Sequence, residues 1–227
     1  MSSDAANAHD QGGNPPGGPA RIALPALLAA VEAHVPRKAP EMGRAAAVLV
    51  PLLPRPDGLH LLFTERSRGL RAHAGQVSFP GGVIDPGDQG PRAAALREAH
   101  EEVGLDPAHA RLHGVLDDCP TFVSGFVITP VVAVIDPASF TADGRYPWRP
   151  SAHEVVALRE LPLEGFLDPA NLRIEHREAQ GHVYELFWYT VEGTVVWGAT
   201  ARILHQLVEL GLGRGPGPGP YDWPIRK

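Results

Sequence analysis

Three glutamates, Glu98, Glu101 and Glu102, are the residues of this chain best placed to do chemistry. On a helix, their spacing of i, i+3 and i+4 puts all three carboxylates on one face, about 5–6 Å apart at Cβ. Like charges this close repel one another, and a hard cation that takes oxygen ligands reverses that cost. The pattern therefore predicts a site for Mg²⁺ or Mn²⁺. Taken alone, however, the same pattern also suits a solvated helix face.

A glycine-rich turn precedes these glutamates. Residues 79–82 read Phe-Pro-Gly-Gly and follow a segment whose apolar and polar residues alternate as in a strand. A second turn, Asp-Pro-Gly-Asp, occupies 85–88. The helix carries an apolar stripe and a glycine suited to end it, at Leu96, Ala99, Val103 and Gly104. A strand, a loop whose backbone can approach a ligand and a carboxylate-rich helix together indicate a site for a metal and a phosphate.

This segment resembles the Nudix box, the signature of the Nudix hydrolases. The family pattern is Gly, five residues, Glu, seven residues, then Arg-Glu-aliphatic-x-Glu-Glu-x-Gly-aliphatic. Here Gly82 leads and Asp88 stands where Glu is usual. Eight residues, one more than the pattern, separate Asp88 from Arg97, and the aliphatic positions are Ala99 and Leu105.

Both departures are similar to those of one subfamily, the coenzyme A pyrophosphatases. That subfamily has an upstream motif, Leu-Leu-Thr-x-Arg-Ser, three residues, Arg, three residues, Gly-x-Val-x-Phe-Pro-Gly-Gly. The chain matches it at 62–67, at Arg71 and at 75–82, and only Phe63 departs from it. The two motifs cover residues 62–105, and a looser resemblance continues to about residue 210.

The resemblance implies an α/β fold, a Nudix-type α/β/α sandwich with a mixed sheet and a loop-helix-loop metal site. It implies a hydrolase that cleaves the pyrophosphate bond of coenzyme A or its derivatives to 3′,5′-ADP and 4′-phosphopantetheine, with Mg²⁺ or Mn²⁺ as cofactor. The expected metal ligands are Glu98 and Glu102, one helical turn apart, followed by Glu101 and the Gly81 carbonyl.

Arg97 and one further glutamate are the remaining catalytic candidates. Arg97 precedes Glu101 by four residues and is assigned to orienting a glutamate, the alternative being a surface ion pair. Either Glu101 or Glu102 could activate water. In other Nudix enzymes a glutamate from a distant loop does so, and Glu154, beside His153, is the candidate here. The alternative for Glu154 is a solvated residue at the start of a strand.

Substrate binding is assigned to the upstream motif. Arg66, Arg71 and also Arg68 could pair with the phosphates of an ADP moiety, and the backbone at Gly82 allows close approach. The alternative is that Arg66 and Arg71 bond backbone carbonyls within a loop. Two other functions stay open: Nudix hydrolysis of ADP-ribose, a dinucleotide or a nucleoside triphosphate, and a non-catalytic Nudix module that binds a nucleotide.

Composition narrows the class of protein. The 227 residues carry a net charge of −6 with a pI near 6.0, which argues against a nucleic-acid-binding surface. The single cysteine, Cys119, cannot form an internal disulfide and suggests a reducing compartment. With no signal peptide, membrane span or peroxisomal ending in the sequence, we expect a cytoplasmic enzyme of a small-molecule substrate, as a monomer or homodimer.

The pattern of turns predicts one Nudix hydrolase domain at 20–212, after a disordered segment at 1–19 and before a Gly/Pro-rich tail at 213–227. Apolar periodicity predicts helices at 20–35 and 199–212, and a short helix before Asp168. The predicted strands are 45–53, 60–65, 112–116, 126–135, 154–160, 184–191 and 194–197.

Overall fold

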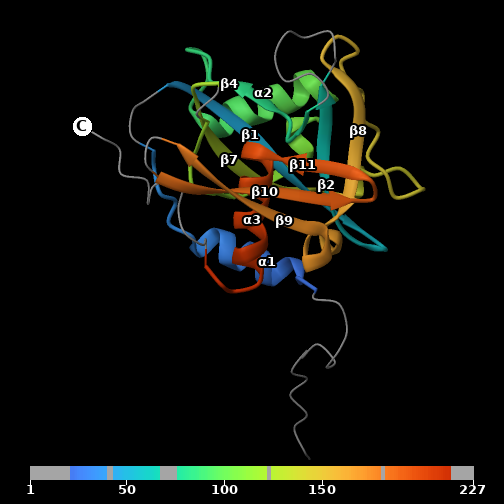
Figure 1. Cartoon of the computed structure of the whole chain (residues 1–227). Coiled ribbons are helices and arrows are strands. Elements are labelled where there is room, and N and C mark those ends of the chain that lie inside the picture. Colours follow the sequence, from blue (N-terminus) through green and yellow to red (C-terminus); the bar gives the residue numbers. More distant parts are fainter. Residues whose placement is uncertain (1–20, 40–42, 67–75, 122–123, 180–181, 216–227) are drawn as a thin grey trace, which may run out of the picture.

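The computed structural model of the protein describes residues 21–39, 43–66, 76–121, 124–179 and 182–215 (Figure 1). A mixed sheet lies at the centre, with the strand order β3-β2-β1-β7-β5. Three further strands extend it, since β4 pairs with β1, β6 with β7 and β8 with β2. The strands of this sheet are β1 Arg44–Arg55, β2 Gly58–Arg66, β3 Val77–Ser78, β4 Gly81–Val83, β5 Ala110–Val115, β6 Cys119–Pro120, β7 Phe126–Ile135 and β8 Val155–Pro162.

The two longest apolar segments form the middle of the sheet. β1 and β7 run parallel, from the pair Arg44 and Phe126 to the pair Leu52 and Val134, whereas the other pairings are antiparallel. β1 returns into β2 through a turn at Pro56 and Asp57, on either side of which Arg55 pairs with Gly58. The predicted mixed sheet is confirmed.

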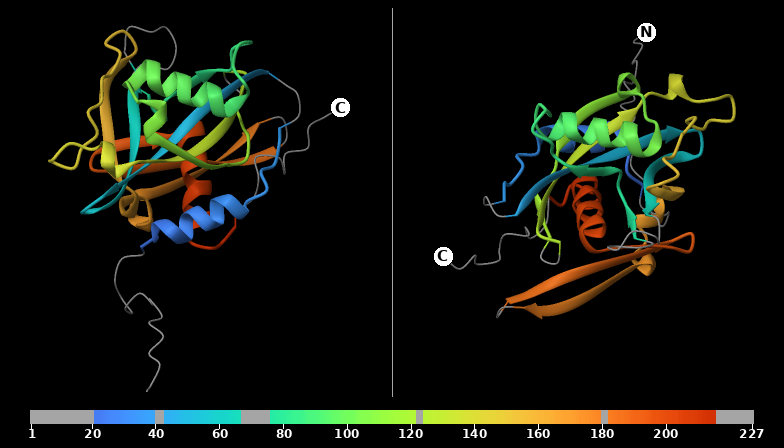
Figure 2. Two further views of the ribbon diagram at one scale, coloured as in Figure 1. Left: turned by 180° about the vertical axis from the view of Figure 1, so that it is seen from behind. Right: turned by 90° about the horizontal axis from the view of Figure 1, so that it is seen from above.

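Helices cover both faces of this sheet (Figure 2). On one face, the alanine-rich side of α2 Pro91–Val103 packs on β1, β4 and β7, with Ala94, Ala95 and Ala99 fully buried. On the other face lie α1 Leu24–Ala33 and α3 Gly198–Gly211, which contact each other. No helix within the described ranges is long and apolar enough to cross a membrane. The predicted α/β/α sandwich is confirmed.

A second, three-stranded sheet packs against α3. Its order is β11-β10-β9, with β9 Leu172–Ala179, β10 His182–Val191 and β11 Thr194–Trp197. Four short 3₁₀ helices complete the elements: η1 Pro107–His109, η2 Pro137–Ser139, η3 Leu163–Phe166 and η4 Pro169–Asn171. The strands predicted at 184–191 and 194–197 correspond to β10 and β11, but the sequence analysis missed β9, in which five of eight residues are polar: Leu-Arg-Ile-Glu-His-Arg-Glu-Ala.

The segment at 81–83 corrects one prediction. The glycines were expected to break the strand into a loop, but Gly81–Val83 forms β4 and pairs with Val48, Ala47 and Ala46 of β1. Glycine is required there because a Cβ on Gly81 would lie 2.3 Å from the Ala47 carbonyl oxygen. Only the turn at 84–90 separates β4 from α2. The close approach of β4 to β1 therefore also places the start of the helix.

The C-terminal end of α2 is closed by a neighbouring loop. Gly104 takes the left-handed conformation with φ 70° and donates its N–H to the His100 carbonyl at 3.0 Å. The carbonyls of Glu102 and Val103, which no longer have partners within the helix, accept N–H groups from Ser151 at 2.8 Å and Arg149 at 2.9 Å. The loop at 146–154 is therefore attached to the end of the helix by its backbone.

We predict that Gly104→Ala lowers the free energy of unfolding by more than Gly213→Ala does. Both glycines have φ +70°, so each alanine costs about 1–2 kcal/mol in the left-handed region. A Cβ at Gly104 would also lie 2.7 Å from the Arg149 Cβ, whereas nothing lies within 4 Å of one at Gly213. Urea unfolding of the two variants measures the difference. Equal losses would show that the contact with Arg149 contributes nothing.

Candidate active site

The N-terminal part of β4 and the last turn of α2 meet at Glu102. The Gly81 N–H donates to Glu102 Oε2 at 3.1 Å, which links the strand to the helix directly. Glu102 is only 5% exposed although it carries a carboxylate. Burying a charged carboxylate is costly, because the group loses its hydration. The burial of Glu102 therefore indicates a functional rather than a structural role for this residue.

Gly82 leaves room for the carboxylate of Glu98. A Cβ on Gly82 would lie 2.6 Å from both Cδ and Oε1 of Glu98. The side chain of Glu98 therefore lies directly over the backbone of β4, in space that only glycine leaves free. The predicted contact of Gly82 with substrate stays a prediction. The contact of Gly82 with Glu98 was not predicted from the sequence.

Arg97 joins the turn before α2 to the carboxylates of the helix. Its Nη1 donates to Glu98 Oε1 at 2.9 Å and to Glu101 Oε2 at 3.2 Å. Its Nε and Nη2 donate to the two carboxylate oxygens of Asp88 at 3.1 and 3.0 Å, and Nη2 also reaches the Val83 carbonyl at 3.0 Å. The contact expected with Glu101 is present, and Arg97 in addition binds Asp88 and Glu98.

The charges in this region differ in how well they are compensated. The hydrogen bond from Arg97 lowers the pKa of Asp88, and the same contact raises the pKa of Arg97. Burial raises the pKa of Glu98 above its ordinary value, although Arg97 opposes the shift. Burial raises the pKa of Glu102 to about 7, and only the Gly81 N–H and the charge of Arg66 act in the opposite direction.

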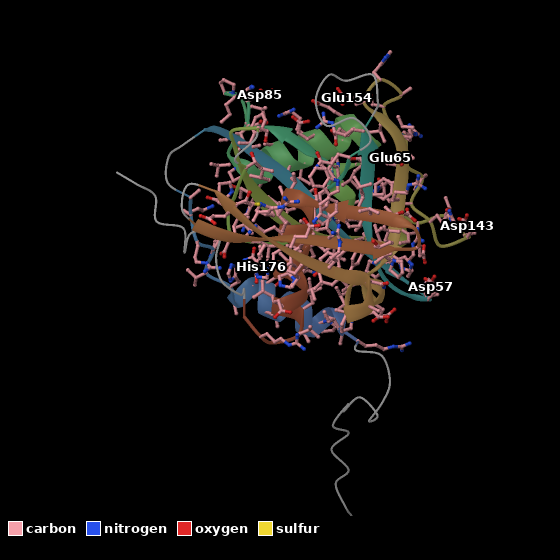
Figure 3. The ribbon with its side chains drawn as sticks, in the orientation of Figure 1. Asp57, Glu65, Asp85, Asp143, Glu154 and His176 are labelled. Carbon is pink, nitrogen blue, oxygen red and sulfur yellow. The ribbon has the colours of Figure 1, made fainter. Side chains whose placement is uncertain are left out.

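Two residues from distant segments complete the arrangement. Arg66 ends β2 at a β-bulge, and its charge acts on Glu102. Glu154 stands just before β8, exposed beside α2 (Figure 3), and its charge raises the pKa values of both Glu98 and Glu102. Glu101 also belongs to this face but is about half exposed. Arg68 and Arg71, both predicted to meet phosphate, lie outside the described residues.

The donor set suits a hard divalent cation. Within the described ranges, no three acidic, histidine or cysteine side chains are grouped tightly enough to hold an ion by themselves. Glu98 and Glu102 nevertheless lie on one helical face, and the charge of Glu98 contributes to the raised pKa of Glu102, a repulsion that a cation would remove. Mg²⁺ needs no full protein cage, because it keeps several waters and uses one or two carboxylates with substrate phosphates. The residues present therefore fit Mg²⁺ or Mn²⁺.

Comparison with known proteins decides the family. Residues 43–187 match the NUDIX domain, which covers more than half of the chain. The chain belongs to the Nudix hydrolase family. Relatives include the uncharacterized Nudix hydrolase NudL of Salmonella newport and of Salmonella agona. Each is 44% identical over 169 residues, which is 72% of this chain and 81% of the relative.

Solved structures resemble the chain at lower similarity. An Ap4A hydrolase of C. elegans is 22% identical with a TM-score of 0.42, over 53% of this chain and 81% of that one. A MutT/nudix family protein from Enterococcus faecalis is 15% identical with a TM-score of 0.44, over 79% and 70%. As a Nudix hydrolase, this protein is an enzyme that acts on phosphoric anhydrides of nucleoside diphosphate derivatives, and such enzymes generally use divalent metal ions.

We predict that Glu102→Gln stabilises the metal-free protein at pH 8 but not at pH 4. The folded pKa of about 7 exceeds the ordinary value of 4.5, so the protonated form favours folding and this contribution is lost as pH rises through 7. Glutamine stays neutral and still accepts the Gly81 N–H. The gain at pH 8 is at most about 3 kcal/mol. Denaturant unfolding across this pH range measures it, and a gain independent of pH would contradict the argument.

We further predict that Gly82→Ala lowers kcat/KM by about 10²-fold, since a displaced carboxylate costs that much. The three atoms nearest to this Cβ would be the carboxylate carbon and both oxygens of Glu98, so the end of that side chain would be forced away from β4. Gly87→Ala is the matched control, because nothing lies within 4 Å of a Cβ there. Activity and Mg²⁺ titration of the two variants test this. Undiminished turnover in Gly82→Ala would show that the position of Glu98 over β4 is unimportant.

Proposed function

We propose that this Nudix hydrolase cleaves the pyrophosphate bond of coenzyme A or its derivatives, releasing 3′,5′-ADP and 4′-phosphopantetheine, with Mg²⁺ or Mn²⁺ as cofactor. The observation that carries the proposal is the upstream motif at 62–82, which runs directly into the box and brings Arg66 within electrostatic range of Glu102. The motif and the metal-binding helix thus contribute to one site.

The motif is held together as a strand pair. Thr64 and Glu65 of β2 pair with Ser78 and Val77 of β3, and the Arg66 N–H donates to the Gln76 carbonyl at 3.1 Å. Phe63, the one departure from the motif, is fully buried and stacks on Phe79 with 4.7 Å between ring centroids. The replacement of leucine at this position therefore has a partner inside the motif and leaves Arg66 where the subfamily pattern requires it.

The carboxylates of α2 supply the metal ligands in this proposal. Glu98 and Glu102 would hold the ion, with Glu101 and the Gly81 carbonyl as further donors, and Arg97 positions Glu98 and Glu101. When bound, a divalent ion neutralises the diphosphate oxygens and lowers the pKa of water. Arg66 would pair with a substrate phosphate, as guanidinium groups do bidentately. Arg71 is assigned the same role.

Hydrolysis requires a base for the attacking water. The water oxygen bonds to one phosphorus, the bond from that phosphorus to the bridging oxygen breaks, and the other phosphate leaves with the bridging oxygen. The water proton passes to a carboxylate. Glu154 suits this role because it is exposed, lies within electrostatic range of Glu98 and Glu102, and has its own segment fastened to α2. Glu101 and Glu102 are the alternatives.

The deciding experiment incubates the purified protein with coenzyme A and Mg²⁺ or Mn²⁺ and separates the products by chromatography. We expect 3′,5′-ADP and 4′-phosphopantetheine. Glu102→Gln should abolish their release, and Glu154→Gln should lower turnover by about 10²-fold if Glu154 is the base. Unchanged turnover in Glu154→Gln would remove Glu154 from the mechanism and leave Glu101 or Glu102 as the base.

A substrate panel separates the alternatives. ADP-ribose, a dinucleoside polyphosphate and a nucleoside triphosphate are tested beside coenzyme A under the same conditions. If coenzyme A stayed intact and one of the other compounds were cleaved, the catalytic residues would keep their assigned roles. The substrate inferred from the upstream motif would then be wrong. If every compound stayed intact with both metals, the proposed reaction would be wrong for this chain, and nucleotide binding without cleavage would be measured next by calorimetry.

A further inference from the structure

A stack of two tryptophans lies on the outer face of the three-stranded sheet. Trp188 of β10 pairs with Trp197 of β11, and their rings stack with 5.2 Å between centroids and 10° between planes. Arg173 pairs with Trp188 from the other neighbouring strand, β9, and its guanidinium lies over the Trp188 ring at 4.8 Å. Phe187 and Tyr189, which alternate with Trp188 along β10, are buried on the side of α3, so the stack belongs to the opposite face.

Trp197 ends this stack with an open surface. In the described part of the chain β11 is an edge strand of its sheet, so Trp188 covers the Trp197 ring on one side only. Trp197 is 40% exposed, whereas the opposite end of the stack is closed by Arg173. Both tryptophans lie outside residues 43–187, which match the NUDIX domain. A flat aromatic surface left in solvent is suited to stack on another flat ring.

The open end of the stack lies beside the upstream motif. β11 lies against β3, and a Cβ on Gly198, the residue after Trp197, would lie 3.7 Å from the side-chain nitrogen of Gln76. The Gln76 carbonyl accepts the Arg66 N–H at 3.1 Å, and the charge of Arg66 acts on Glu102. A continuous row of neighbouring residues therefore leads from the tryptophan stack to the buried carboxylate of the candidate active site.

We propose that the open surface of Trp197 is a nucleobase subsite, on which the base of the substrate stacks while its diphosphate lies at the carboxylates of α2. A nucleoside diphosphate derivative carries its base and its phosphates at opposite ends. Trp197 and Glu102 likewise stand at the two ends of the row, with Arg66, the predicted phosphate partner, between them. Every base offers a π-face to an indole, and loss of one such stack weakens binding about 10-fold.

Gln76 provides a polar contact for the edge of the base. Its side-chain amide carries donors and an acceptor, which match the N7 acceptor and the N6 donor of adenine. The subsite therefore favours adenine, the base that coenzyme A and ADP-ribose share. It rests on the activity of the family toward nucleoside diphosphate derivatives and not on coenzyme A as the substrate.

The test compares two ligands by calorimetry in the presence of Mg²⁺: α,β-methylene-ADP and methylenediphosphonate. A methylene group replaces the bridging oxygen in both, so neither is hydrolysed, and only the first carries a base. Trp197→Ala should weaken binding of the nucleotide about 10-fold and leave methylenediphosphonate unchanged, because only a stacking surface is removed. Trp197→Phe retains a π-face and should restore most of the affinity.

Val195→Ala is the matched control. Val195 lies two residues before Trp197 on the same face of β11 and is 42% exposed, so its truncation should change neither affinity. Equal weakening of both ligands in Trp197→Ala, unchanged binding of the nucleotide, or no binding of the nucleotide by the unsubstituted protein would overturn the proposal. None of these outcomes depends on the products formed from coenzyme A.

Gln76→Ala tests the preference for adenine. We expect the unsubstituted protein to bind α,β-methylene-ADP about 10-fold more tightly than the guanine analogue, since guanine presents an acceptor where adenine presents the N6 donor. Gln76→Ala keeps the backbone carbonyl that accepts the Arg66 N–H and should remove this difference. A preference that survives in Gln76→Ala would show that Gln76 does not contact the base.

Discussion

The guanidinium of Arg97 is the interaction on which the active site depends. Asp88, Glu98 and Glu101 each bear a negative charge, and the same side chain donates to all three and to the Val83 carbonyl. Without it, these carboxylates would repel one another, and the hydrogen bonds that join Asp88 and the Val83 carbonyl to α2 would be lost. A planar group with five donors can meet this many acceptors at fixed angles, which lysine cannot do.

Glu102 is the exception to this compensation. Arg97 does not reach it, and its one hydrogen bond among the residues that the structure describes comes from the neutral Gly81 N–H. Its pKa is accordingly raised most among the carboxylates of the helix, mainly by burial. A carboxylate held in this state gains more from a nearby cation than one already paired with arginine. The difference between Glu102 and Glu101 therefore follows from which side of α2 faces β4.

Local periodicity was sufficient to predict α2, its capping glycine and the common face of the three glutamates. Periodicity could not predict which of the three glutamates is buried. The burial of Glu102 depends on β4, which pairs with a strand more than thirty residues earlier in the chain. Asp88 looked like a departure from the box, yet its carboxylate receives two hydrogen bonds from Arg97 and one from the Asp85 N–H. β9 was missed because five of its eight residues are polar or charged and its apolar alternation ends after Ile174.

The position of Glu154 depends on the contacts that close the C-terminal end of α2. Every helix ends with carbonyls that lack partners, and α2 resolves this by accepting the N–H groups of Arg149 and Ser151. Those bonds close the helix and at the same time hold the segment that carries Glu154, whose own N–H returns to the Ser151 carbonyl at 3.1 Å. The upstream motif reaches the site separately, through β2 and β3. The motif and α2 meet where the Gly81 N–H donates to Glu102 and where the Glu98 carboxylate lies over Gly82. Two distant segments of the chain therefore converge on the same pair of carboxylates.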